Sequence, residues 1–168
     1  MITGALRLFA SLISTDQSGI GKVSEAVNED VLNWKDIVDG SGDYEANLLF
    51  TAKKTDLADT TTESYDLEGG NLSNRAGQVT DFKKVSVILL KAHETNAGPI
   101  EIDGGSADSF KPFLTGTAPK LSVEPGGVFL FAETKTGLTV SPTADLLKIK
   151  NTSGDIAGYD LVLVGKDA

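Results

Sequence analysis

The chain has 168 residues, of which 40% are hydrophobic and 23% are charged, and it contains no cysteine and a single histidine. This composition is typical of one folded domain, and it excludes disulfide scaffolds, thiolate metal sites and metal sites built from several histidines. The formal net charge of −9 repels phosphate, so we expect neither nucleic acid nor an anionic membrane as a partner.

The N-terminal stretch MITGALRLFASLIST is interrupted by Arg7, and no apolar run reaches the roughly 18–20 residues of a membrane span. We therefore expect no signal peptide, and we expect folding in a cytoplasm. Alternation of Leu6, Leu8, Ala10 and Leu12 predicts a strand over residues 5–13.

Residues 14–45 are glycine-rich and then acidic, and they predict an extended arm with little core of its own. Ordering such an arm costs about 1–2 kcal/mol per residue in backbone entropy, so it needs a surface to lie on. The only tryptophan, Trp34, belongs to this arm. It is either a plug in the domain's own core or an anchor in a partner's pocket.

Alternating and β-branched segments begin near Asn47 and continue to the end of the chain. The segment 81–95 is the strongest predicted strand, and its stretch Val85–Leu90 is apolar on both faces, which indicates burial on both sides. Gly126 and Gly127 after Pro125 predict a tight turn. Other β-prone segments, from which most of the remaining strands are expected, are 48–57, 60–69, 100–103, 109–114, 120–125, 127–133, 138–142, 145–151 and 159–166.

About eight strands at this spacing, with no helical crossover, predict an all-β fold. We expect an antiparallel β-sandwich of jelly-roll type over residues 47–168, preceded by an extended N-terminal arm over residues 1–46.

No pattern of catalytic or metal-ligating residues emerges from the sequence. His93 ends the strongest strand and has no nucleophile motif such as G-x-S-x-G to serve, so we interpret it as a structural residue. The acidic turn that begins at Asp39 lacks two residues of a calcium loop, because Tyr44 replaces the sixth-position glycine and Phe50 the final glutamate. We interpret this turn, and also the acidic turn from Asp103 to Asp108, as solvated turns. We expect no cofactor, no metal and no enzymatic activity.

Residues from about 47 to 165 resemble small structural proteins of tailed bacteriophages. The similarity lies in the run ANLLFTAKKTDLADTTTESYDLEGGNLSNRAGQVTDFKKVSVILLKA, in VEPGGVFLFA and GLTVSPTADLLKIKN, and in the terminal YDLVLVG. Some members of this family look like capsid decoration, or cement, proteins with a jelly-roll body. The matching motifs are turn and strand signals, which report a fold more specifically than a role.

The resemblance implies a protein that binds between capsomers of the major capsid protein and stabilises the shell. It implies attachment as a homotrimer on the capsid exterior of the virion, after assembly in the host cytoplasm. The arm would then lie on the capsid or exchange between protomers, and the candidate interface residues are Phe9, Leu32, Trp34 and Ile37. Alternative functions are a tail or head-fibre component and a carbohydrate-binding β-sandwich module.

Overall fold

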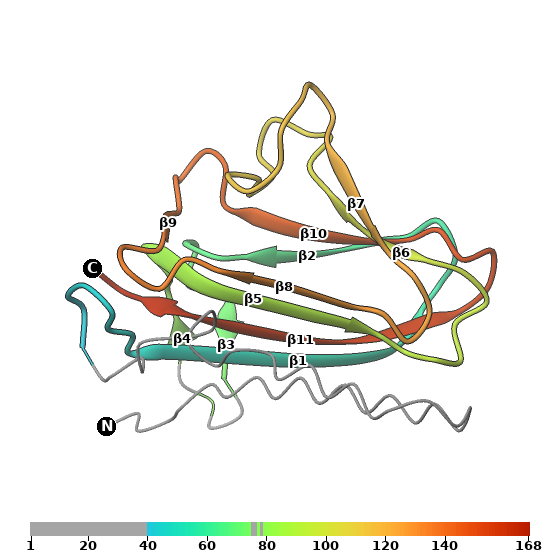
Figure 1. Cartoon of the computed structure of the whole chain (residues 1–168), viewed down its shortest axis with the longest axis horizontal. Coiled ribbons are helices and arrows are strands. Elements are labelled where there is room, and N and C mark those ends of the chain that lie inside the picture. The colour runs from blue at the N-terminus through green and yellow to red at the C-terminus, as the bar shows by residue number, and fades with distance from the viewer. Residues whose placement is uncertain (1–39, 75–76, 78) are drawn as a thin grey trace, which may run out of the picture.

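The alternating segments pair into two antiparallel β-sheets that face each other (Figure 1). The structure is a computed structural model that describes residues 40–74, 77 and 79–168, and no helix occurs in this part of the chain. The predicted all-β antiparallel sandwich is therefore confirmed. The predicted strand over residues 5–13 and most of the predicted arm lie outside the described residues.

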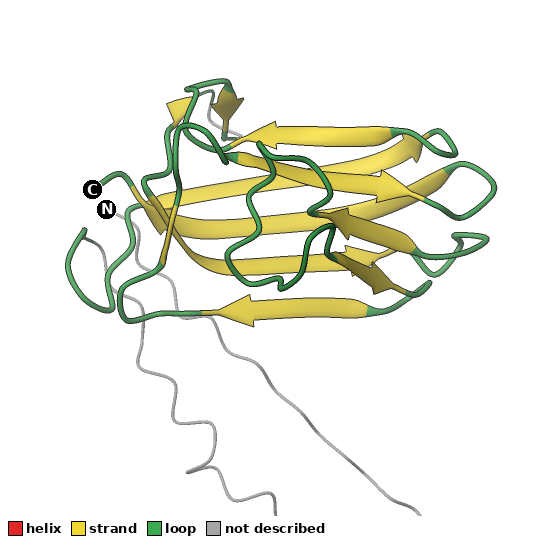
Figure 2. Ribbon diagram, turned by 90° about the horizontal axis from the view of Figure 1, so that it is seen from above, coloured by secondary structure: helices red, strands yellow, loops and turns green. Residues whose placement is uncertain are grey.

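The first sheet has the strand order β1-β11-β5-β8, and a short strand β9 also pairs with β5. Its strands are β1 (Leu48–Leu57), β11 (Ala157–Lys166), β5 (Lys84–Ala92), β8 (Val128–Ala132) and β9 (Leu138–Thr139). The second sheet has the order β2-β10-β6-β7. Its strands are β2 (Thr62–Asp66), β10 (Leu146–Asn151), β6 (Ile100–Asp103) and β7 (Lys120–Val123). A small hairpin, β3 (Leu72–Ser73) with β4 (Val79–Thr80), lies at one edge of the sandwich (Figure 2).

The strand pairs are nested in the sequence. β1 pairs with β11, β2 with β10, β5 with β8 and β6 with β7, and every pair is antiparallel. The chain therefore behaves as one long hairpin whose tip is the β6–β7 connection, rolled so that successive pairs alternate between the sheets. This arrangement leaves β7 and β8 as edge strands of the two sheets, and both lie on the same side of the sandwich.

The core lies between the two sheets because the side chains of a strand point alternately to its two faces. In the first sheet, β11 directs Tyr159, Leu161 and Leu163 inward, and none of them is more than 1% exposed. In the second sheet, β10 directs Leu147 and Ile149 inward, and both are fully buried. The same alternation places Lys148 and Lys150 on the outer surface, as the sequence pattern predicts.

The turn at Gly126 is confirmed, because this residue has a φ of 75° and Gly127 N donates to Glu124 O over 2.8 Å. The expected strand over residues 109–114 is wrong: this segment is a loop that carries only a single bridge at Ser109. Pro112 has no N–H to donate to a neighbouring strand. The loop is held instead by Phe110, which is 2% exposed and donates from its backbone to Leu146 O.

A hydrogen bond between two buried tyrosines joins the sheets through the core. Tyr65 on β2 and Tyr159 on β11 bring their hydroxyl oxygens to 2.8 Å. Burial raises the pKa of both phenols, so each stays a protonated hydroxyl near neutral pH. Because each hydroxyl satisfies the other, neither is left as an unpaired polar group inside the sandwich.

We expect Tyr159→Phe to lower the free energy of unfolding by about 1–3 kcal/mol, because the Tyr65 hydroxyl then stays buried without its partner. The double variant Tyr65→Phe/Tyr159→Phe should recover part of this loss, since both polar groups are gone. Urea denaturation of the native chain, of Tyr65→Phe, of Tyr159→Phe and of the double variant measures the coupling free energy between the two hydroxyls. Strictly additive losses in the double variant would show that the two hydroxyls do not stabilise each other.

Candidate interaction surface

The single histidine has a structural setting at the end of β5. His93 Nε2 lies 3.5 Å from Asp160 Oδ2, and both side chains are partly exposed. The imidazole packs against Gly158, where an added Cβ would collide with Nδ1. The backbone N–H of His93 also donates to Gly158 O over 3.0 Å. This geometry ties β5 to β11 and presents no nucleophile to the imidazole.

The first acidic turn is closed by a glutamate. Glu45 Oε2 accepts from Gly42 N over 2.6 Å, which fixes the turn from Gly42 to Glu45, whereas Asp39 lies outside the described residues. Across the part of the chain that the structure describes, no group of three or more His, Cys, Asp and Glu residues is placed to hold a metal ion.

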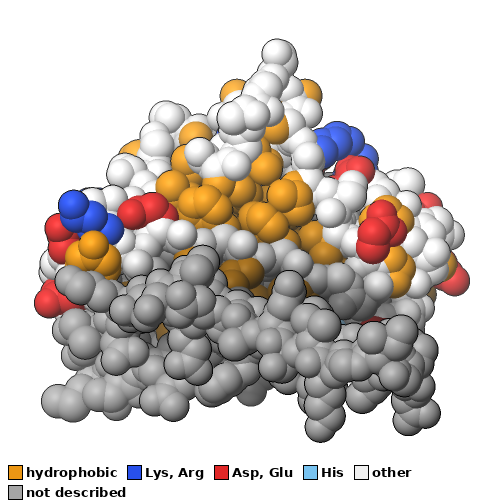
Figure 3. Space-filling view, in the orientation of Figure 1, with side chains coloured by type: hydrophobic (Ala, Val, Ile, Leu, Met, Phe, Trp, Pro, Cys, Tyr) orange, Lys and Arg blue, Asp and Glu red, His pale blue; other side chains and the backbone are white. Residues whose placement is uncertain are grey.

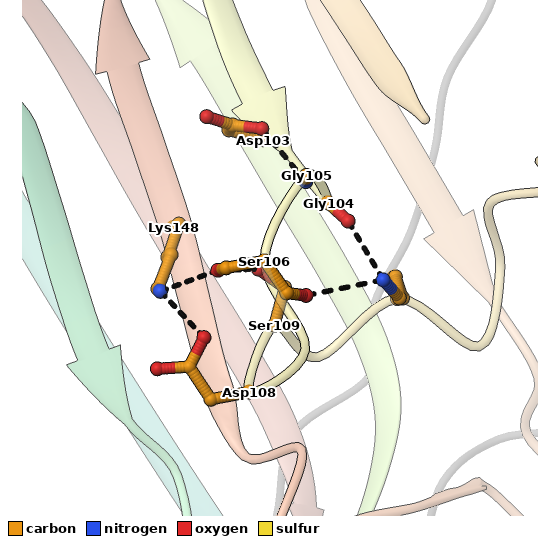
Figure 4. A network of polar contacts seen from close by, with 8 residues as sticks. Asp103, Gly104, Gly105, Ser106, Asp108, Ser109 and Lys148 are labelled. Atoms are coloured by element: carbon orange, nitrogen blue, oxygen red, sulfur yellow. Dashed lines mark hydrogen bonds and ion pairs between the residues drawn. The ribbon is translucent and has the colours of Figure 1, made fainter. Parts of the chain in front are cut away.

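The second acidic turn is organised around two lysines (Figure 4). Lys148 on β10 donates from Nζ to Asp108 Oδ1 (2.7 Å) and to Ser106 Oγ (2.6 Å). Lys111 donates to the carbonyls of Gly104 (2.8 Å) and Ser106 (3.1 Å). The loop between β6 and β7 is thereby tied to the second sheet and to itself. The polar cluster shapes this loop, and its geometry supplies no pair of acid and base groups facing a cavity.

The most unusual surface of the molecule is apolar and lies where the sandwich opens between β7 and β8 (Figure 3). We call it the apolar edge and define it by five half-buried residues that pack against the core: Phe113, Leu114, Leu121, Phe129 and Phe131. The ring of Phe113 lies between the sheets' edges, with its centroid 5.9 Å from that of Phe129 and 5.5 Å from that of Phe131.

The apolar edge forms because, among the described residues, no further strand pairs with β7 or β8 at the edges of the two sheets. Phe129 and Phe131 lie opposite the core residues Leu90 and Ile88 in the β5–β8 register, so they point inward between the sheets. Leu121 lies opposite Ile102 in the β6–β7 register and points inward from the other sheet. Aromatic rings of this kind bury large areas when a partner covers them, and they often dominate interface energies.

The edge strand β8 also offers free backbone groups. Ala92 N donates to Gly127 O and Glu133 N donates to Ser86 O, so the alternation of an antiparallel ladder turns the N–H and C=O groups of Val128, Leu130 and Ala132 away from β5. No described residue bonds to those outward groups. The five residues of β8 carry no charge or proline, the usual devices that protect an exposed edge strand.

The predicted interface residues Phe9, Leu32, Trp34 and Ile37 lie outside the described residues. Sequence reasoning identified VFLFA as a core strand and did not identify it as a surface. The signal was present, because a strand that is apolar on both faces and five residues long cannot bury both faces at a sheet edge. Phe113 was missed because its segment was read as a strand.

Comparison with protein families and with curated proteins finds no match to this chain. Within the described residues, no helix of the length and apolarity needed to cross a membrane is found.

The Lys148–Asp108 ion pair gives the domain a measurable pH dependence. The hydrogen bond from Lys148, helped by one from Ser106, lowers the pKa of Asp108 from 3.8 to about 2. A carboxylate with a lowered pKa stabilises the folded state above its ordinary pKa, and this contribution is lost as the pH falls from 3.8 through about 2.

We therefore expect Asp108→Asn to unfold with a smaller pH dependence than the native chain between pH 3.8 and about 2. The measurement is chemical denaturation at a series of pH values. Asp167→Asn, which removes an exposed carboxylate whose side chain bonds to Asn47, is the matched control. Identical pH profiles for the native chain and Asp108→Asn would contradict the assignment.

Proposed function

We propose that this protein is a structural component of a virion, of the capsid decoration type, which binds between capsomers of the major capsid protein as a homotrimer and stabilises the shell. The single observation that carries the proposal is the apolar edge, a half-buried aromatic cluster continuous with β8, an edge strand that pairs with β5 on one side and with no described strand on the other. A protein that acts by covering another protein's surface needs such an area and needs no reactive group.

We also propose that the sandwich is a jelly roll. The supporting observation is the nested pairing of eight strands, β1 with β11, β2 with β10, β5 with β8 and β6 with β7, divided over two four-strand paths. A jelly roll is a double-sheet, eight-strand architecture with antiparallel pairing. It agrees with the sequence resemblance to phage structural proteins, which covers the same residues.

The attachment mechanism follows from the properties of the apolar edge. Burial of apolar area contributes about 25 cal/mol per Å², and a strand added to β8 gains backbone hydrogen bonds along Val128, Leu130 and Ala132. Three copies bound around one symmetry axis act together, so modest contacts per copy are enough for lasting attachment. The shell is then stabilised because one decoration protein joins several capsomers.

A carbohydrate-binding module is the weaker candidate, because such modules present exposed tyrosine and tryptophan rings to a sugar. Tyr65 and Tyr159 are buried and bonded to each other, so neither ring can stack on a ligand. A tail or head-fibre component shares the resemblance with the decoration type, and it differs in the place at which it attaches.

Addition of the purified protein to capsids that lack it tests the proposal. We expect symmetric extra density at the junctions between capsomers, visible by electron cryo-microscopy. Phe113→Asp should weaken capsid binding more than tenfold, because truncation of a central aromatic anchor costs about 2 kcal/mol or more.

The matched control is Ile156→Asp, which places the same charge at an apolar residue that is 61% exposed in the β10–β11 turn. It should bind as the native chain does. Leu121→Asp is the second variant in case Phe113→Asp does not fold. Density on the tail alone would favour the fibre alternative, and equal binding of all variants would show that the apolar edge is not the attachment surface.

The homotrimer has its own test. We expect sedimentation equilibrium to give the mass of three copies at micromolar concentration, because three-fold capsid positions match a three-fold assembly. A monomer at that concentration would count against the trimer and leave the capsid-binding experiment to decide the rest.

A further inference from the structure

The first sheet has a second apolar face, turned away from the core. The β1–β11, β11–β5 and β5–β8 registers align side chains across all four strands in rows on this outer face. One row consists of Leu49, Val164, Val87 and Ala132. The next row consists of Thr51, Val162, Leu89 and Leu130. Seven of these eight residues are apolar. This composition is typical of an interface and differs from that of a solvated sheet face.

The same face becomes polar one row further along. Lys53, Asp160 and Lys91 follow in register on β1, β11 and β5, and only the β8 member of this row, Val128, is apolar. The two apolar rows therefore form a bounded patch, which we call the outer patch, at the end of the sheet where β11 and β8 finish.

Burial is uneven within the outer patch, because Leu49 at the end of the first row is 41% exposed. Val87 lies in the middle of the first row and is only 1% exposed. The second sheet covers the inner face, and none of the described strands lies over the outer face (Figure 1).

The described chain starts at that same end of the sheet. Tyr44 N donates to Lys135 O (3.0 Å) just beyond β8, and Asn47 N donates to Gly165 O (3.1 Å) at the end of β11. Lys166 continues the outward alternation of β11, is 2% exposed, and donates from Nζ to Gly42 O over 2.6 Å. Residues 42–47 thus run across the end of the sheet beside the outer patch.

We propose that the outer patch is the docking site for residues 31–38 of the same chain, with Trp34 as the anchor. This segment, VLNWKDIV, ends two residues before Gly40 and contains Val31, Leu32, Trp34, Ile37 and Val38. Eight extended residues span about 26 Å, whereas four strands are about 14 Å across at a spacing of about 4.8 Å. The segment therefore reaches every position of the patch.

This docking assigns Trp34 to its own chain and not to a pocket of a partner. Its energetic reason is the hydrophobic effect: the patch and the segment each carry apolar side chains, and their association removes both from water. The inference is independent of the capsid proposal, because it concerns the free protein.

Fluorescence of Trp34 tests the docking without any label, since the full chain contains no other tryptophan. In the native chain we expect emission at shorter wavelength than that of a solvated tryptophan and strong protection from acrylamide. Leu130→Asp, which places a charge in the outer patch, should shift the emission to longer wavelength and raise the quenching constant several-fold.

The matched control is Val128→Asp, which places the same charge on the same strand and the same face but in the polar row, at a residue that is 58% exposed. It should leave the emission unchanged. Far-UV circular dichroism confirms that both variants keep the sandwich, and Leu89→Ser replaces Leu130→Asp if the latter does not fold. A solvated Trp34 in the native chain, or equal effects of the two aspartates, would overturn the proposal.

A final experiment distinguishes docking within one chain from exchange of the segment between copies. Leu130→Asp protein, which keeps Trp34, is refolded together with Trp34→Phe protein, which keeps an intact patch. Docking within the chain predicts that the emission stays at long wavelength in the mixture. Recovery of the short-wavelength emission would show that the segment occupies a neighbouring copy and would overturn the proposed occupant.

Discussion

Strand β11 hydrogen-bonds to β1 on one side and to β5 on the other. The registers of these two ladders determine which side chains of the three strands face the core and which face outward. They place Tyr159, Leu161 and Leu163 in the core and Val162 and Val164 on the outer face. A slip by one residue would exchange these two sets. The Tyr65–Tyr159 hydrogen bond marks the register, because only one of the two faces of β11 meets a hydroxyl from the second sheet.

The same registers explain why this sandwich has two apolar surfaces besides its core. Strands β5, β8 and β11 carry apolar residues on both faces, and a two-layer fold can cover only one of them. The apolar side chains of the outer face form the outer patch, and inward-facing side chains of β8 form part of the apolar edge where the sandwich lies open. One surface lies beside the start of the described chain, and the other lies at the opening between β7 and β8.

Two buried asparagines bond to the backbone of neighbouring segments. Asn96 is 7% exposed, and its side-chain amide both donates to Gly158 O and accepts from Gly158 N, which imitates a strand pair beyond the end of β5. Asn151 is fully buried and donates to the carbonyls of Leu57 and Asp155. Both asparagine side chains have fixed backbone partners, so they hold turns in place.

The sequence by itself determined the fold class, most of the strands and the tight turn at Gly126, because alternation and glycine positions are local properties of the chain. It did not indicate that the apolar run in β8 forms a surface, because this run was read as a core strand. Local patterns failed at residues 109–114, where the apolar spacing resembles a strand but Pro112 and the burial of Phe110 favour a loop.

Only the tertiary structure decided which strands are edges and which residues share a row. Val128 to Ala132 reads as a core strand in the sequence, and it becomes an exposed edge because the nested pairing places β8 last in its sheet. Phe113 joins Phe129 and Phe131 across a loop, a contact that no spacing rule encodes. The physical reason is that strand order and register depend on partners far away in the sequence, whereas the alternation of side chains within one strand does not.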